Sequence, residues 1–299
     1  MGTVETRQRI MVNSVLYLTD FSEASEVALP FAVEIARAYG AKVYALNVLV
    51  PSPVVYVSPE SPETSIEWQE EWAASEMQRV DAQLMGLPRE TIVERGTELW
   101  SPVRQVLSEH DIDLIVLGTH GRTGMQKLLL GSAAEEIFRR SPIPVITIGP
   151  SVCCGAHNDA RFRRVLFPTD FSEASVAAAP YAISLAQENE ARLVLLHVIR
   201  HFPNDHVARR GEMSVAEAMH HLSELVPRDA DFWCRPDPVV RYGEPGEEIL
   251  SAASDHGADL IVLGVRGSSN YSTAVTHVTR ATAYKVVAHA ECPVLTVRS

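Results

Sequence analysis

A glycine-rich stretch carries the residues of this chain that are best suited to binding an anion. Its fixed positions are Gly118, Gly121, Gly131 and Ser132, spaced as Gly-x2-Gly-x9-Gly-Ser, and the basic Arg122 lies inside it. Glycine lets a backbone adopt positive φ and approach a ligand closely, and a helix start offers unpaired amide groups and the positive end of its dipole. The stretch therefore favours binding of a phosphate group.

The position of this stretch supports the same chemistry. It directly follows the apolar run of residues 113–117, which has the length and the branched side chains of a strand buried on both faces. A second polar stretch, Thr19-Asp20, directly follows another such run, residues 15–18. Both stretches are thus expected at carboxyl ends of strands.

The composition excludes some partners. With 299 residues, of which 46% are hydrophobic and 21% charged, the chain has ordinary globular composition and enough length for two domains. The net charge of -12 argues against nucleic acid and anionic membranes, because both select for clustered Lys and Arg. The four cysteines include no Cys-x-x-Cys pair and are too sparse for a disulfide scaffold, as expected of a cytoplasmic protein.

An internal repeat divides the chain. Residues 15–25 recur as residues 165–175, and residues 113–118 recur as residues 259–264. Two matches in the same order indicate one duplicated unit. The first matched segment is therefore expected to be a strand of the fold rather than a cleaved leader. The first unit, the linker and the second unit are predicted at residues 1–150, 151–160 and 161–299.

Apolar periodicity predicts alternating strands and helices in both units. A helix is expected to begin at Ser22 and to stop at Gly40, with Pro30 kinking it or starting a new segment. The first unit's expected strands are residues 15–18, 42–49, 91–95, 114–117 and 145–148, and its other helices are residues 66–85, 102–110 and 133–140. The second unit's expected strands begin at residue 164 and span residues 193–199, 239–242, 260–263 and 294–297, and its helices span residues 180–188, 215–225, 247–254 and 281–288.

This alternation decides the fold class. Strands that alternate with helices of such length indicate right-handed βαβ crossovers and a mostly parallel sheet covered on both faces. The fold is therefore predicted to be α/β, with two tandem, doubly wound, Rossmann-like sheets of five parallel strands each.

In this setting the chain resembles the universal stress protein family, whose nucleotide-binding members carry Gly-x2-Gly-x9-Gly-Ser/Thr in this place. The resemblance implies the strand order 3-2-1-4-5, in which the first and fourth strands are neighbours and open a crevice at their carboxyl ends. It implies ATP as the ligand, with Mg²⁺ as an optional ion on the phosphates. It also implies an internal pseudo-dimer through the fifth strands, with a homodimer as a further option.

The resemblance also assigns roles to single residues, each with a simpler alternative. Asp20 would contact the base or ribose, or only cap the next helix. The main chain of Val48 would meet the adenine, or Val48 is only a core valine. The base-side contact near Leu18 stays open, because this position is commonly proline in the family.

For the phosphates, the resemblance points to Gly121, Gly131 and Ser132. The alternative is that the glycines only shape a loop and Ser132 caps the helix that follows. The second unit keeps Asp170, but counting back from its final strand places Arg280-Ala281 where the first unit has its Gly-Ser pair. A side chain there would occupy space that phosphates need, so the second site is expected to be weak or empty.

Three functions are compatible with this sequence. The first is a cytoplasmic, ATP-binding tandem universal stress protein that signals by occupancy and hydrolyses ATP slowly at most, since no activated nucleophile or general-base pair is visible. The second is a nucleotide-independent interaction or dimerisation module. The third is an enzyme of the adenine-nucleotide α-hydrolase-like group, which would need a reactive second-substrate site. No metal site is expected, because His220-His221 lacks a ligand set at supportive spacing.

Overall fold

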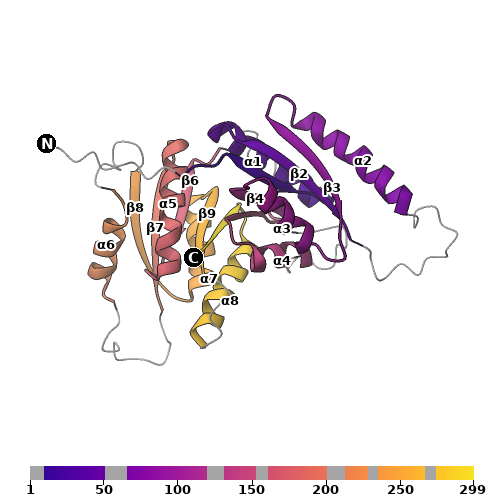
Figure 1. Ribbon diagram of the computed structural model, residues 1–299. Coiled ribbons are helices and arrows are strands. Elements are labelled where there is room, and N and C mark those ends of the chain that lie inside the picture. Colours follow the sequence, from indigo (N-terminus) through magenta and orange to yellow (C-terminus); the bar gives the residue numbers. More distant parts are fainter. Residues whose placement is uncertain are drawn as a thin grey trace. The chain divides into compact units, whose positions relative to one another are not determined.

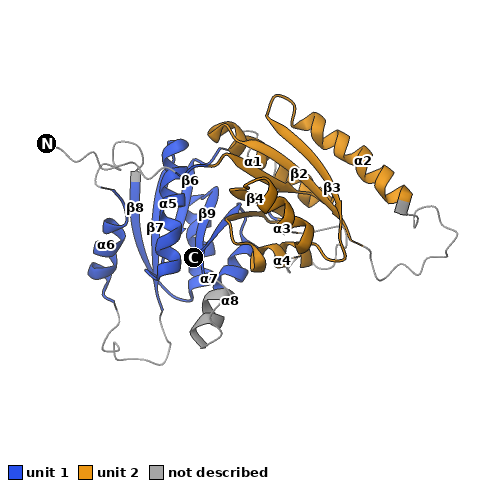
Figure 2. Ribbon diagram, in the orientation of Figure 1, with its two compact units in different colours: residues 1–11, 151–157, 161–299 blue, residues 12–150, 158–160 orange. Residues whose placement is uncertain are grey.

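The computed structural model describes residues 10–50, 66–119, 131–152, 161–200, 213–227, 235–266 and 274–299. Contacts divide these residues into two compact units, coloured orange and blue in Figure 2. We call residues 12–150 the N-terminal unit and residues 161–299 the C-terminal unit. The contacts group residues 10 and 11 with the C-terminal unit.

The N-terminal unit is a parallel sheet with connecting helices. Its strands lie in the order β3-β2-β1-β4-β5, and every described pairing between them is parallel. The predicted α/β class and the order 3-2-1-4-5 are thus confirmed for this unit. Its described elements (Figure 1) are β1 Ser14–Leu18, α1 Glu23–Tyr39, β2 Lys42–Leu49, α2 Ile66–Gln83, β3 Arg89–Arg95, α3 Trp100–Glu109, β4 Leu114–Gly118, α4 Ser132–Arg140 and β5 Val145–Ile148.

The C-terminal unit repeats this arrangement. Its strands lie in the order β8-β7-β6-β9-β10, again with parallel pairings throughout the described residues. Its described elements are β6 Arg164–Pro168, α5 Glu173–Glu188, β7 Arg192–Ile199, α6 Val215–Glu224, β8 Arg235–Tyr242, α7 Pro245–His256, β9 Leu260–Val265, α8 Ala274–His289 and β10 Val294–Arg298.

The handedness of the crossovers places the helices. Right-handed connections put α1 and α2 on one face of the first sheet and α3 and α4 on the other. The packing of α3 against α4, and of α7 against α8 in the C-terminal unit, agrees with this. The direction of winding therefore changes between β1 and β4, and between β6 and β9.

The central strands form the core of each unit. All five residues of β1 are buried, as are the four after Arg164 in β6. Tyr17 buries its ring and donates its hydroxyl to the carbonyl of Ser25 at 2.7 Å. Its burial raises the pKa of Tyr17 to about 12. β1 and α1 are thus held together by a buried hydrogen bond as well as by apolar packing.

The second repeated segment begins with an aspartate that fixes strand pairing. Asp113, directly before β4, accepts from the amide of Asn13 at 2.7 Å and from that of Ser14 at 3.1 Å. Asp259, directly before β9, accepts from the amides of Arg163 and Arg164 at 2.8 and 2.9 Å. In both units this carboxylate satisfies backbone groups where the first strand begins.

The limits of α1 agree with the prediction. Ser22 is its N-cap, accepting from the amide of Ser25 at 3.3 Å, and Gly40 ends it with φ 70°. The helix continues through Pro30, so no new helix begins there. Pro30 is exposed, which leaves its ring and the lost backbone hydrogen bond on the solvent side.

The predicted first residues of three elements in the C-terminal unit were wrong. Helix α5 begins at Glu173 rather than near residue 180, because Ser172 caps it as Ser22 caps α1. Strand β8 begins at Arg235 rather than at residue 239. Its two prolines are tolerated because it lies at the sheet edge. Helix α8 begins at Ala274, seven residues before the predicted start at residue 281.

No described helix combines the length and the apolar character needed to cross a membrane.

Candidate functional site

The first and fourth strands bring two distant stretches together. Leu18, the last residue of β1, pairs with Leu46 on one side and with Leu117 on the other. Asp20 and Gly118 therefore lie at the same carboxyl edge of the sheet, where the winding direction changes. This is the place where doubly wound folds bind ligands.

Asp20 is held by the residue that caps the next helix. Its Oδ1 accepts from the amide of Ser22 at 3.1 Å and from the hydroxyl of Ser22 at 2.5 Å. Ser22, not Asp20, is the N-cap of α1. The alternative in which Asp20 itself caps the helix was therefore wrong, and its half-buried carboxylate positions the capping residue instead.

The turn between Asp20 and Ser22 is strained. Phe21 has φ 58°, in the left-handed region that bulky residues rarely adopt. Its amide donates to Oγ1 of Thr19 at 3.0 Å, and its ring meets Trp72 edge-on at a centroid distance of 5.1 Å. Sequence patterns assigned Thr19 and Phe21 no role in the site, although both belong to the repeated segment.

The C-terminal unit contains the same turn. Phe171 has φ 60°, and its amide donates to Oγ1 of Thr169 at 3.0 Å. Oδ1 of Asp170 accepts from the amide of Ser172 at 3.0 Å and from Oγ of Ser175 at 2.8 Å. Partial burial of Asp170 favours a higher pKa, but these hydrogen bonds outweigh it and hold the pKa below its ordinary value. Asp170 is therefore ionised at neutral pH.

Gly118 has a packing role that the sequence analysis did not foresee. Its φ is outside the positive range, so Gly118 does not use the left-handed conformation that glycine allows. A Cβ on Gly118 would lie 2.5 Å from the carbonyl carbon of Ala24 in α1. The same holds for Gly264 and the carbonyl carbon of Ala174 in α5, again at 2.5 Å. Both glycines therefore allow a helix to pass close to a strand end.

The start of α4 lies beside the end of β4. The amide of Gly131 donates to the carbonyl of Thr119 at 2.6 Å, and the amide of Thr119 donates to that of Ile148 at 2.9 Å. Gly131 is the N-cap of α4 and Ser132 is its first residue, so the alternative in which Ser132 caps the helix was wrong. Ser132 is exposed. The first turn of α4 thus presents amide groups at this edge of the sheet.

The other predicted site residues are Val48, Gly121 and Arg122. Val48 is half-buried near the carboxyl end of β2, where it pairs with Glu94, so it is both a strand residue and open to a main-chain contact. Gly121 and Arg122 lie outside the described residues. Their roles stay predictions.

The corresponding edge of the C-terminal unit contains a cavity of about 430 Å³. Residues of β6, β7 and β9 line it, together with Pro245 and Ile249 of α7 and Thr282 and Ala283 of α8. Asp170 lies on its wall. The sequence predicted a weak or empty phosphate site here and gave no indication of an apolar cavity.

The histidines of the C-terminal unit make local contacts. His221 approaches Glu224 at 3.4 Å, and Nδ1 of His197 hydrogen-bonds the carbonyl of Thr169 at 2.8 Å. Within the described part of the chain, no group of three or more His, Cys, Asp or Glu residues could hold a metal ion.

Comparison with known sequences matches both units to one protein family. The model of the universal stress protein family matches residues 11–149 and, a second time, residues 161–298. A universal stress protein of Methanocaldococcus jannaschii is 31% identical over 143 residues, which cover 46% of this chain and 82% of that protein. One of Mycolicibacterium smegmatis is 25% identical over 270 residues, covering 86% of this chain and 88% of that protein.

Comparison with solved structures supports the tandem fold. The crystal structure of a universal stress protein from Archaeoglobus fulgidus superimposes with a TM-score of 0.70 at 21% identity, covering 97% of this chain and 99% of that one. At this identity the likeness concerns the fold.

Proposed function

The chain belongs to the universal stress protein family, and we propose that its N-terminal unit binds ATP, with Mg²⁺ as an optional ion on the phosphates. The base and ribose would meet Asp20 and the main chain of Val48. The phosphates would meet Gly131 and Ser132 at the start of α4, together with Gly121 and Arg122. The empty and occupied forms would act as a signal in the cytoplasmic response to stress.

One hydrogen bond carries the proposal. The bond from the amide of Gly131 to the carbonyl of Thr119 joins the helix start to the strand end at 2.6 Å. It brings the positive end of the α4 dipole to the edge that holds Asp20. An anion bound at the helix start and a hydroxyl donor bound at Asp20 match the two ends of a nucleotide.

The backbone of Gly131 makes it a useful probe. With φ -61° and ψ 149°, Gly131 has a conformation that any residue adopts. The backbone conformation therefore does not require glycine here, and we attribute it to space for a ligand. A large side chain at this position is expected to remove binding without straining the backbone.

Holding ATP is favoured over rapid hydrolysis. Phosphoryl transfer needs a positioned water, metal ligands and charge stabilisation. At this edge, Oδ1 of Asp20 already accepts two hydrogen bonds from Ser22, so this oxygen is engaged by the helix cap rather than by a water. We therefore expect slow turnover at most.

The test is isothermal titration of ATP with Mg²⁺ into the parent protein and into Gly131→Met. One site per chain in the parent and none in the variant is the expected result. Arg139→Met is the matched control, because it introduces the same side chain on the exposed far end of α4. Thermal unfolding of each variant verifies that the fold is intact.

Two other outcomes would count against the proposal. If the parent binds no ATP at millimolar concentration, the nucleotide-independent interaction module becomes the better account of this fold. Equal binding by the parent and Gly131→Met would show that the start of α4 does not hold the phosphates. Packing of the units through their fifth strands, and homodimer formation, stay predictions.

A further inference from the structure

Three aromatic rings of the N-terminal unit form a row that ends at the surface. The ring of Phe21, in the Asp20 turn, meets Trp72 of α2 edge-on at a centroid distance of 5.1 Å. Trp72 in turn stacks on Trp68, with ring planes 10° apart and centroids 6.4 Å apart. Trp68 is 39% exposed. The row therefore presents an indole to solvent and supports it with two rings behind it.

The exposed indole lies outside the face through which α2 packs. The helix packs against β2 and β3, and its buried residues include Ala73, Met77 and Val80. This spacing of four and three residues marks one face of a helix. Trp68 lies on the flank of that face, so its side chain is not needed to hold α2 on the sheet.

Two carboxylates lie beside the exposed indole. Glu71 follows Trp68 by three residues and Glu67 by four, so these side chains are neighbours on the helix surface. Both glutamates are exposed, and no cation among the described residues lies within ion-pair distance of either. Glu70, nearer the sheet, contacts Arg95 of β3 instead. The indole is therefore bordered by negative charge that the described part of the chain does not neutralise.

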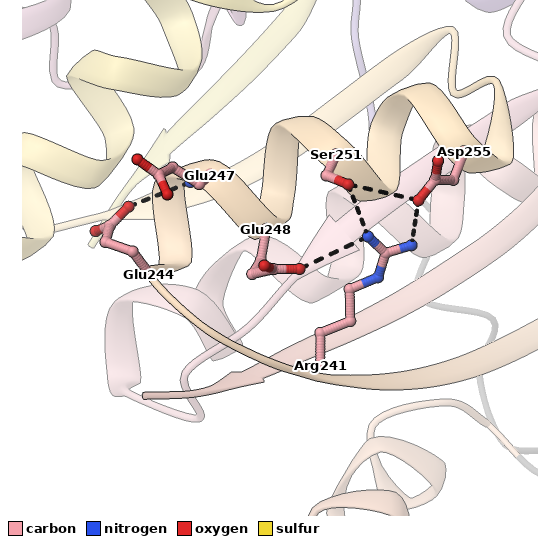
Figure 3. Close-up of polar contacts among 6 residues, drawn as sticks. All are labelled: Arg241, Glu244, Glu247, Glu248, Ser251 and Asp255. Atoms are coloured by element: carbon pink, nitrogen blue, oxygen red, sulfur yellow. Dashed lines mark hydrogen bonds and ion pairs between the residues drawn. The ribbon is translucent and has the colours of Figure 1, made fainter. Parts of the chain in front are cut away.

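The acidic face of α7 differs, because its charges are matched within the chain. As Figure 3 shows, Arg241 of β8 contacts Glu248 at 3.7 Å and Asp255 at 2.7 Å. Glu247 lies 3.0 Å from the ammonium of Lys285. The exposed glutamates of α2 have no such cation among the described residues, so a cation from outside the chain can take that place.

The C-terminal unit does not repeat the aromatic row. Phe171 takes the place of Phe21, and its ring meets His221 of α6 at a centroid distance of 5.4 Å. His221 and the neighbouring His220 both approach Glu224 at 3.4 Å. Within the described residues, an exposed indole beside unmatched carboxylates is therefore a feature of the N-terminal unit.

An indole beside a carboxylate suits a guanidinium group. The planar guanidinium stacks on the indole face by cation–π attraction and donates paired hydrogen bonds to a carboxylate. An ammonium group is a compact, strongly hydrated charge that does not match this planar arrangement. Tryptophan and arginine are also the residues that most often dominate the affinity of protein interfaces.

We propose that Trp68, Glu67 and Glu71, which we call the α2 surface, bind an arginine-bearing segment of a partner protein. The arginine side chain lies on the face of the Trp68 indole that points away from Trp72, and it donates to the glutamates. The charge of the surface selects a basic partner and speeds its association. The proposal does not depend on ATP binding, because none of these residues is assigned to the nucleotide.

The probe is a short capped peptide of alternating arginine and glycine, titrated into the full chain at low salt. Two control peptides replace arginine by lysine, which keeps the charge, or by citrulline, which keeps the planar shape without the charge. Binding is followed by the NMR shift of the Trp68 indole N–H, assigned through its loss in Trp68→Phe. We expect the arginine peptide to bind at least about fivefold more tightly than either control peptide.

Two variants of the α2 surface test its residues. Trp68→Ala, followed by calorimetric titration, is expected to weaken binding of the arginine peptide about tenfold or more. Glu67→Gln combined with Glu71→Gln is expected to weaken it by a similar factor and to reduce its salt dependence. Thermal unfolding verifies that each variant keeps its fold.

Matched controls separate the α2 surface from general properties of the chain. Met85→Ala removes another exposed apolar side chain of the same unit, one that is 69% exposed. Glu190→Gln combined with Glu291→Gln makes the same change in net charge at exposed positions of the C-terminal unit. Both controls should bind the arginine peptide as the parent does.

Three outcomes would overturn the proposal. Equal binding of the lysine peptide would mean that net charge alone decides, and equal binding of the citrulline peptide would mean that charge plays no part. Unchanged binding of the arginine peptide by the Trp68 and glutamate variants would place its site elsewhere. Failure of the parent protein to bind ATP would contradict only the proposed function.

Discussion

Gly118, at the end of β4, lies so close to Ala24 of α1 that a Cβ on the glycine would be 2.5 Å from the carbonyl carbon of that residue. No real Cβ tolerates such a distance to a backbone atom. The contact joins the two stretches that frame the candidate site, because α1 begins directly after the Asp20 turn. The glycine that introduces the phosphate-binding pattern is thus needed for helix packing whether or not a ligand binds.

Gly118→Ala is expected to lower the free energy of unfolding by about 1–3 kcal/mol, because the added methyl group forces α1 away from β4. Urea unfolding followed by circular dichroism measures this change. The control is Ser108→Ala on the exposed side of α3, which should stay within about 0.5 kcal/mol of the parent. An unchanged midpoint for Gly118→Ala would mean that α1 shifts freely at this contact.

Ser22→Ala is expected to cost about 1 kcal/mol of stability through loss of the helix cap. It should also weaken ATP binding, because Asp20 loses the hydroxyl that orients its carboxylate at 2.5 Å. Calorimetric titration and thermal unfolding measure the two effects. Ser214→Ala is the matched control: Ser214 caps α6 in a capping box, so its loss should cost similar stability and leave ATP binding unchanged. Equal ATP affinity in both variants would remove Asp20 from the proposed site.

Asp170 should make stability depend on pH in a defined window. Burial favours a higher pKa for Asp170, but hydrogen bonds from Ser172 and Ser175 lower it overall, so the folded state prefers the ionised form. The stabilisation is complete above the unfolded pKa of about 3.9 and is lost as pH falls through the lower folded pKa. The stability difference between the parent and Asp170→Asn should therefore be constant above about pH 5 and shrink below pH 4. A difference that grows on acidification would contradict the assignment.

Cys292 should be unreactive in the folded protein. It is 4% exposed, and burial raises its pKa to about 12, with Asp259 and Glu291 adding to the rise. Because the thiolate is the reactive form, iodoacetamide at pH 8 should leave Cys292 unmodified until a denaturant is added. Peptide mass spectrometry measures the labelling, and fast labelling of the native protein would show that the strand it precedes, β10, opens readily.

Much of the fold could be predicted because it depends on local patterns. The continuous apolar runs marked strands buried on both faces, and Ser22 and Gly40 marked the ends of α1. The repeated segments showed the duplication directly. Predicted element boundaries were wrong where tertiary contacts outweighed local signals. Pro180 lies inside α5, and β8, at the edge of the sheet, contains two prolines.

The sequence by itself determined the fold class, the repeat and the residues at the carboxyl ends of β1 and β4, because periodicity, caps and turns act over a few residues. Only the tertiary structure decided what those residues do. It showed that Gly118 serves helix packing and that the C-terminal unit has a largely apolar cavity beside Asp170. These facts depend on distances between atoms far apart in the chain, which no local pattern encodes.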